Sequence, residues 1–225
     1  MVDAAALGKE AILLFLAAIF VIGAVLFLPA GTLDYWQAWL YMAVLLVPPI
    51  FVGLYFLRND PELLERRLKT REKEAKQKAM IKITSLIFII GFLIPGLDRR
   101  FGWSSVPFEA VIAADLLVFI GYFIVFLVLR ENSYAARTVE VEKGQKLVST
   151  GPYAVIRHPM YFGVLLMLLA TPIALGSYWA LPPFLLLIPA IIFRILNEEE
   201  VLRRGLPGYT AYCRKTRYRL LPHVW

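Results

Sequence analysis

Long apolar stretches separated by short polar segments dominate the pattern of this chain. A helix needs about 20 largely apolar residues to cross the hydrocarbon core of a membrane, with a range of about 17–25. Six stretches approach that length, at residues 11–28, 38–57, 81–97, 106–129, 160–175 and 179–196. The last two are the shortest and contain four prolines, whose freed backbone groups neighbouring helices can satisfy. The pattern predicts an all-α polytopic membrane protein with about six transmembrane helices.

Composition supports this class. Of the 225 residues, 60% are apolar and 18% are charged, whereas a soluble domain has about 45–50% apolar and 25% charged residues. The single cysteine, Cys213, excludes a disulfide scaffold. A signal peptide is the alternative interpretation of the first stretch. Only Lys9 precedes that stretch as a basic residue and no clear cleavage site precedes Pro29, so we expect a retained span.

The basic residues lie between the apolar stretches rather than on one continuous face, so the net charge of +7 does not indicate a nucleic-acid partner. With six spans, 22 of the 24 lysines and arginines fall on one side of the membrane, and only Arg99 and Arg100 fall on the other. Cytoplasmic loops carry the excess of positive charge in membrane proteins. We therefore expect both termini to be cytoplasmic.

Two polar segments are expected on the cytoplasmic side. Residues 61–80 carry Glu/Lys and Glu/Arg pairs at the i,i+4 spacing of a solvated helix, which predicts a cytoplasmic helix over 58–80. Residues 138–148 alternate apolar and polar positions around Lys143-Gly144, which favours a short hairpin or paired extended segment. We expect one integrated domain, with an N-terminal four-span region at 1–130 and a binding and catalytic region at 131–225 that contains a helical hairpin at 159–196.

Candidate chemistry gathers in this second region. The chain has no nucleotide-loop or hydrolase motif and only two histidines, His158 and His223, so we expect no metal site. Within the segment GPYAVIRHPMYFG (151–163), Pro159 predicts the start of a helix with His158 at its cap. The positive end of that helix, next to Arg157, favours an anion. The alternative is that these residues are only interfacial anchors.

A second cluster lies at residues 194–200, where Arg194 precedes three successive glutamates. The two arms of the 159–196 hairpin are about equally long, so Glu198 and Glu199 should return to the membrane face of Arg157 and His158. A solvated helix end is the alternative, although acidic residues oppose the dipole at a helix C-terminus. A ligand with a carboxylate, an ammonium and a sulfonium, such as S-adenosylmethionine, would suit such a site.

These residues carry a family resemblance. Leu147-Val148, Gly151-Pro152-Tyr153, Arg157-His158-Pro159-x-Tyr161 and, about 36 residues later, Glu198-Glu199 resemble the RHPxY…EE signature. That signature belongs to integral-membrane methyltransferases of the isoprenylcysteine carboxyl methyltransferase and phospholipid methyltransferase group. The tail from Gly208-Tyr209 to Leu221-Pro222 is similar to the bacterial and archaeal members, which implies a prokaryotic cell membrane. The resemblance covers residues 132–225.

The resemblance implies S-adenosylmethionine in a cytoplasm-facing pocket and a lipid-like or prenylated acceptor that arrives from the bilayer. Methyl transfer to a carboxylate oxygen or to an amine nitrogen is expected. The catalytic residues implied are Arg157, Arg194 and Glu199. The residues implied around the methyl donor are Gln145, Leu147, Gly151, Tyr153, His158, Tyr161, Glu198 and Glu199.

Two other functions stay open at this point. Sterol reductases share a related C-terminal fold and use a nicotinamide cofactor, and the basic tail 214–219 could hold its 2′-phosphate. A non-catalytic membrane scaffold is the other. Asp115, in the middle of the fourth stretch, lines the acceptor tunnel or hydrogen-bonds across helices to Thr84 or Ser85, since an isolated acid at membrane depth is costly.

Overall fold

The computed structural model describes residues 4–68, 75–135, 141 and 144–225. Helices and turns account for the regular structure in these residues, and no β-strand occurs among them. The helical elements are α1 (Ala4–Ala30), α2 (Trp36–Asn59), α3 (Pro61–Leu68), α4 (Ala75–Phe101), α5 (Phe108–Glu131), the short 3₁₀ helix η1 (Gly151–Ala154), α6 (Pro159–Ala174), α7 (Leu181–Leu185), α8 (Leu187–Gly205) and α9 (Tyr209–Lys215). The predicted all-α class is confirmed.

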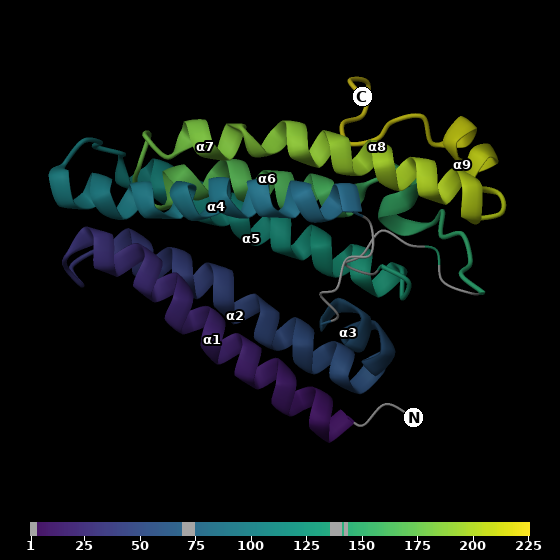
Figure 1. Ribbon diagram of the computed structural model, residues 1–225, viewed down its shortest axis with the longest axis horizontal. Coiled ribbons are helices and arrows are strands. Elements are labelled where there is room, and N and C mark those ends of the chain that lie inside the picture. Colours follow the sequence, from purple (N-terminus) through teal and green to yellow (C-terminus); the bar gives the residue numbers. More distant parts are fainter. Residues whose placement is uncertain (1–3, 69–74, 136–140, 142–143) are drawn as a thin grey trace.

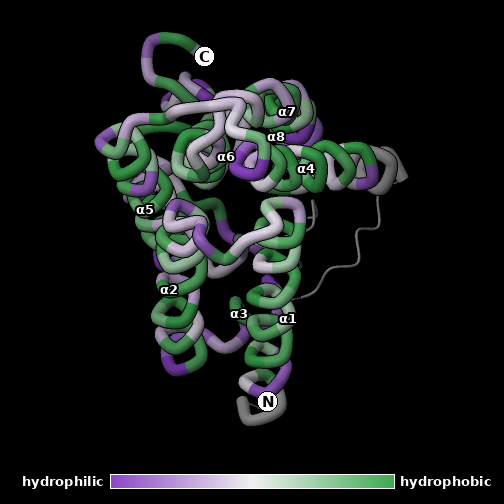
Figure 2. The backbone as a smooth tube through the Cα atoms, turned by 90° about the vertical axis from the view of Figure 1, so that its left-hand side faces the viewer, coloured by the Kyte–Doolittle hydropathy of each residue, from purple (hydrophilic) through white to green (hydrophobic). Residues whose placement is uncertain are grey.

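Among the residues that the structure describes, four segments are long and apolar enough to cross a membrane, namely Leu7–Ala30, Trp36–Asn59, Phe108–Glu131 and Leu181–Gly205. Their outward side chains include Phe20, Phe51 and Phe119, all exposed, and Figure 2 colours most of α1, α2 and α4 as hydrophobic. Exposed apolar surface on this scale requires lipid around it. The chain is an integral membrane protein. The count of six stays a prediction, because α6 has only 16 residues and α4 ends in Asp98-Arg99-Arg100.

The polar segments differ from their prediction. Within the helix expected over 58–80, α2 runs to Asn59, Asp60 separates it from α3 at Pro61–Leu68, and α4 begins at Ala75. Residues 69–74 of this stretch lie outside the described residues. In place of the hairpin expected over 138–148, Val141 and Gly144–Val148 form a turn and irregular backbone, while 138–140 and 142–143 lie outside the described residues. The helix of the last apolar stretch extends past residue 196, to Gly205.

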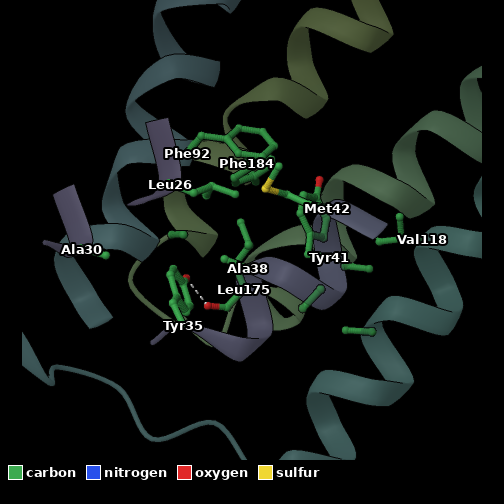
Figure 3. Close-up of a cluster of buried hydrophobic side chains, with 14 of the residues drawn as sticks. Leu26, Ala30, Tyr35, Ala38, Tyr41, Met42, Phe92, Val118, Leu175 and Phe184 are labelled. Carbon is green, nitrogen blue, oxygen red and sulfur yellow. Dashed lines mark hydrogen bonds between the residues drawn. The ribbon is translucent and has the colours of Figure 1, made fainter. Parts of the chain in front are cut away.

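The helices form one bundle in which α6 packs against α5, α4 contacts α1, α7 and α8, and α2 joins α1 to α5. Figure 1 shows α1 and α2 diverging from the other helices toward the end where α3 and α9 lie. Side chains from α1, α2 and α4–α8 meet in the core, part of which Figure 3 shows. There Phe184 packs on Phe92, and the hydroxyl of Tyr35 donates to the carbonyl of Leu175 at 2.6 Å. The core ties the two halves of the chain together.

Two glycines set the distance between α5 and α6. A Cβ atom on Gly121 would lie 2.6 Å from the carbonyl oxygen of Gly163, and a Cβ on Gly163 would lie 2.8 Å from that of Gly121. Small residues at a crossing let two membrane helices approach closely. Because α6 carries the RHPxY segment at its first turn, this contact positions the candidate site.

Asp115 is buried in this bundle, with 4% of its surface exposed. Neither carboxyl oxygen has a hydrogen-bond partner within the parts of the chain that the structure describes. The predicted hydrogen bond to Thr84 or Ser85 is therefore wrong. Other buried polar groups of the bundle do have partners. The hydroxyls of Tyr41 and Thr171 hydrogen-bond each other at 2.9 Å.

Four of the five tryptophans lie at the end of the bundle opposite α9. Trp36, Trp39, Trp103 and Trp179 are all exposed there, whereas Trp225 belongs to the C-terminal tail. Asp98 connects two loops at this end, because its carboxylate accepts hydrogen bonds from the hydroxyls of Ser104 at 2.6 Å and Ser177 at 2.5 Å. Tryptophan is enriched where a membrane helix meets the lipid headgroups, so one membrane boundary lies at this end.

Candidate active site

The candidate site begins at the N-terminus of α6. Pro159 is its first residue and His158 its N-cap, as the sequence predicts. The backbone N–H groups of Arg157 and His158 donate to the carbonyls of Tyr218 and Arg219, each at 2.9 Å. The C-terminal tail is therefore bonded to the segment that enters the helix. Pairing across about 60 residues of sequence leaves no local signal, which is why the sequence analysis did not find it.

Glu199 of α8 stands beside this segment, so the predicted return of the hairpin to Arg157 and His158 is confirmed. Its carboxylate is buried, with 3% of the residue exposed. Four basic side chains surround it: Arg157 Nε at 2.9 Å, His158 Nε2 at 3.3 Å, Arg219 Nε at 3.2 Å and Arg203 Nη2 at 3.5 Å. The N–H of Arg157 Nε is not aligned for a hydrogen bond, so this contact is an ion pair only. Glu199 joins α6, α8 and the tail.

Glu198 points elsewhere, although it is the next residue along the chain. The hydroxyl of Tyr161 donates to Glu198 Oε2 at 2.6 Å and accepts from Arg194 Nε at 3.0 Å. One tyrosine thus links a carboxylate and a guanidinium across α6 and α8. All three residues line a pocket. This pocket wall can meet a positive group through Glu198 and a negative group through Arg194.

The pocket opens beside η1, the first turn of α6 and the end of α8, and has about 880 Å³ of empty space when its open mouth is included. Eight of the predicted site residues line it: Gln145, Leu147, Tyr153, Arg157, His158, Tyr161, Arg194 and Glu198. Glu199 and Gly151 are not among its lining residues. The sequence analysis missed Asn132, Tyr134, Ala135, Lys146, Val148, Pro159, Met160, Val201, Leu202, Leu206, Tyr209 and Tyr212.

Gly151 does not line the pocket but begins η1 with a backbone turn. It has a positive φ of 56°, and a Cβ atom there would lie 3.0 Å from the side chain of Glu131. The hydroxyl of Thr150 donates to the same carboxylate at 2.5 Å. A glycine is needed because only glycine adopts this conformation without strain. The turn fixes η1, and with it Tyr153, against the end of α5.

Tyr153 is a buried phenol that accepts a hydrogen bond from Asn132 Nδ2 at 3.0 Å. Burial, reinforced by the nearby carboxylate of Glu198, raises the pKa of Tyr153 to about 12, against the opposing effect of the Asn132 hydrogen bond. The hydroxyl therefore keeps its proton at neutral pH. Tyr153 offers the pocket an uncharged polar group beside apolar ones.

The pocket lining has an apolar part and a polar part. Leu206, Tyr209 and Tyr212 form a buried apolar cluster against which Leu147, Leu202 and Tyr153 pack. Tyr161, Glu198 and Arg194 form the polar part. The described residues contain no group of three or more histidine, cysteine, aspartate or glutamate side chains that could hold a metal ion. The pocket can therefore take a molecule with one flat apolar part and one charged part.

Most of the residues that line this pocket lie in a part of the chain that resembles a known family. The profile of phospholipid methyltransferases matches residues 110–207, which run from α5 through the end of α8. This part of the chain, slightly less than half of its length, is similar to phospholipid methyltransferases. The match contains the RHPxY segment, Tyr153, Arg194 and both glutamates.

Two curated relatives are each similar to part of the chain. A mouse Delta(14)-sterol reductase is 29% identical over 91 residues, which are 39% of this chain and 22% of the reductase. A nickel-cobalt-cadmium resistance protein of Alcaligenes xylosoxydans xylosoxydans is 34% identical over 88 residues, which are 37% of this chain and 39% of that protein. The chain matches well under half the length of either relative.

The whole fold resembles that of the eukaryotic intramembrane Ras methyltransferase, an isoprenylcysteine carboxyl methyltransferase. The superposition covers 100% of this chain and 99% of the enzyme, with a TM-score of 0.50 and 15% sequence identity. At that identity the likeness concerns the fold. It extends the similarity to α1–α4, which lie outside the family match.

Proposed function

We propose that this chain is a membrane methyltransferase that binds S-adenosylmethionine in the pocket and methylates a lipid-like or prenylated acceptor. The observation that carries the proposal is the Arg194–Tyr161–Glu198 chain, which lies in a pocket formed largely by the family-matched residues. When bound, S-adenosylmethionine supplies an electrophilic methyl group on a sulfonium.

The residues present fit this cofactor. A charged amino-acid part suits the polar part of the lining, where Glu198 would face a cation and Arg194 a carboxylate. A flat base suits the apolar part formed by Leu147, Leu202 and Leu206. Methyl transfer is an in-line displacement, so catalysis consists largely of positioning and electrostatics.

The residues of the pocket then have different roles in the reaction. Arg194 orients the acceptor, because its guanidinium presents donors in one plane and Tyr161 holds that plane through Nε. Glu198 opposes the positive charge of the methyl donor or takes a proton from an amine acceptor. Arg157 and His158 line the pocket and are held by Glu199. Glu199 thereby acts through its neighbours rather than by contact with a ligand.

The site is proposed to face the cytoplasm. The basic residues of the tail and of α8, among them Arg203, Arg204 and Arg219, gather at its end of the bundle, and the exposed tryptophans gather at the opposite end. The positive-inside rule then puts the pocket and both termini on the cytoplasmic side. An acceptor anchored in the inner leaflet can reach the pocket from the bilayer.

Transfer of a radiolabelled methyl group tests the proposal. Purified protein in lipid vesicles is mixed with labelled S-adenosylmethionine and either short prenylcysteine analogues or lipids with amino headgroups. Label in an organic-soluble product that depends on Glu198 supports the function. Oxidation of NADPH with reduction of a sterol, and without methyl transfer, would instead support a sterol reductase activity for this chain, the activity that the name of the mouse relative states.

A further inference from the structure

Helix α9 carries two tyrosines with the same surroundings but different hydroxyl contacts. Tyr209 and Tyr212 are both buried, both line the pocket, and their ring centroids are 5.8 Å apart. The hydroxyl of Tyr212 donates to the backbone carbonyl of Tyr153 at 2.7 Å. The hydroxyl of Tyr209 has no hydrogen-bond partner anywhere in the described residues. The two side chains are therefore a natural test pair.

A buried hydroxyl without a partner is unusual, because removing it from water costs free energy that a hydrogen bond normally restores. Only 3% of Tyr209 is exposed, so water does not satisfy the group from bulk solvent. Phenylalanine would pack equally well in an apolar cluster at no such cost. A tyrosine at this position is explained if its hydroxyl bonds to a ligand in the pocket.

The surroundings of Tyr209 indicate which part of the ligand it meets. Its ring belongs to the apolar cluster with Leu206 and Tyr212, packed on Leu147 and Leu202. Glu198 and Arg194 are instead linked through the hydroxyl of Tyr161. A nucleoside, with a flat base and several hydrogen-bond acceptors, fits the apolar cluster, and the charged amino-acid part fits Glu198 and Arg194.

The Tyr209 hydroxyl is available as a donor. Burial, reinforced by the carboxylate of Glu199, raises the pKa of Tyr209 well above its usual range, so the phenol keeps its proton. The ring nitrogens and ribose oxygens of a nucleoside can accept that proton in a hydrogen bond. Helix α9 begins at Tyr209 and thus lies beyond the family match, which ends at residue 207.

We propose that the hydroxyl of Tyr209 donates a hydrogen bond to the nucleoside part of the methyl donor and so sets its affinity. This inference rests on the proposed function, because it takes S-adenosylmethionine or its product as the occupant of the pocket. Tyr209 would be a ligand-binding residue supplied by the tail helix. Tyr212, by contrast, would be structural.

The test compares Tyr209→Phe with Tyr212→Phe in the full-length protein. Calorimetry measures the binding of S-adenosylhomocysteine and of 5′-methylthioadenosine, which lacks the amino-acid part, and thermal unfolding is followed without ligand. Tyr209→Phe should weaken both ligands by about tenfold, the effect of one hydrogen bond, and leave the unfolding temperature unchanged or raised. Tyr212→Phe should lower the unfolding temperature, because it leaves the Tyr153 carbonyl without its donor.

Three results would overturn the inference. Unchanged affinity of Tyr209→Phe for both ligands would show that the hydroxyl bonds to neither. A loss of affinity for S-adenosylhomocysteine alone would move the contact to the amino-acid part. A drop in unfolding temperature as large as that of Tyr212→Phe would show an internal partner. If wild-type protein binds neither ligand, the proposed function itself fails, which is a separate outcome from these three.

Discussion

At the scale of single residues, two adjacent glutamates have different positions and therefore different expected roles. Glu199 is enclosed by Arg157, His158 and Arg219, whereas Glu198 contacts Tyr161 in the pocket. The sequence analysis could place both on the correct membrane face, because the equal lengths of the hairpin arms decide that. It could not distinguish them, because the direction of each side chain depends on how α8 is rotated against α6 and the tail.

Glu199→Gln should destabilise the protein by about 3 kcal/mol, since it leaves the buried guanidinium of Arg157 without its counter-charge. Glu198→Gln removes a charge from the pocket wall and should weaken S-adenosylmethionine binding about tenfold at nearly unchanged stability. Chemical denaturation and calorimetry on both variants check this contrast. Equal stability of the two variants would show that Glu199 does not hold the site together.

Arg194→Lys should slow methyl transfer by about ten- to a hundredfold while the affinity for the methyl donor stays close to that of the wild type. The reason is that lysine cannot present two parallel donors to the acceptor, and a charge-assisted hydrogen bond is worth about 1.5–3 kcal/mol. Single-turnover kinetics and donor titration separate the two effects. A variant that turns over at the wild-type rate would exclude Arg194 from acceptor orientation and leave Arg157 for that role.

At the scale of elements, apolar runs predicted most membrane helices to within a few residues because lipid-facing helices must be apolar nearly throughout. Pro159 likewise identified the start of α6, since proline fits the first helical turn. The pairing of the tail with Arg157 and His158, and the contribution of α9 to the pocket, were not predicted. Both depend on tertiary contacts between distant segments, which leave no periodic pattern in the sequence.

The contact between α5 and α6 gives a prediction at this scale. Gly163→Ala places a Cβ atom 2.8 Å from the carbonyl oxygen of Gly121, which forces the helices apart and should cost about 1–3 kcal/mol. Because α6 carries the site, ligand affinity should fall as well. Gly53→Ala is the matched control, since nothing lies within 4 Å of a Cβ there. The unfolding temperatures of the two variants test this prediction. Similar unfolding temperatures would mean that α5 and α6 can accommodate the added methyl group without loss of stability.

At the scale of the whole molecule, the two ends of the bundle differ in composition, which predicts its orientation. Asp34 lies near the tryptophan end, where Arg99 donates to its carbonyl at 2.8 Å, and Arg204 lies on the exposed end of α8 beside the site. In a Cys213→Ala background, Asp34→Cys should react with a membrane-impermeant maleimide in intact cells. Arg204→Cys should react only after the cells are opened. The reverse pattern would put the pocket outside the cell.

The central claim concerns what the pocket binds, and a calorimetric titration of wild-type protein with S-adenosylmethionine tests it most directly. The account predicts a dissociation constant in the micromolar range, roughly −8 kcal/mol, with weaker binding by Glu198→Gln and no binding of NADPH. Binding of NADPH in place of S-adenosylmethionine, or binding of neither, would contradict it.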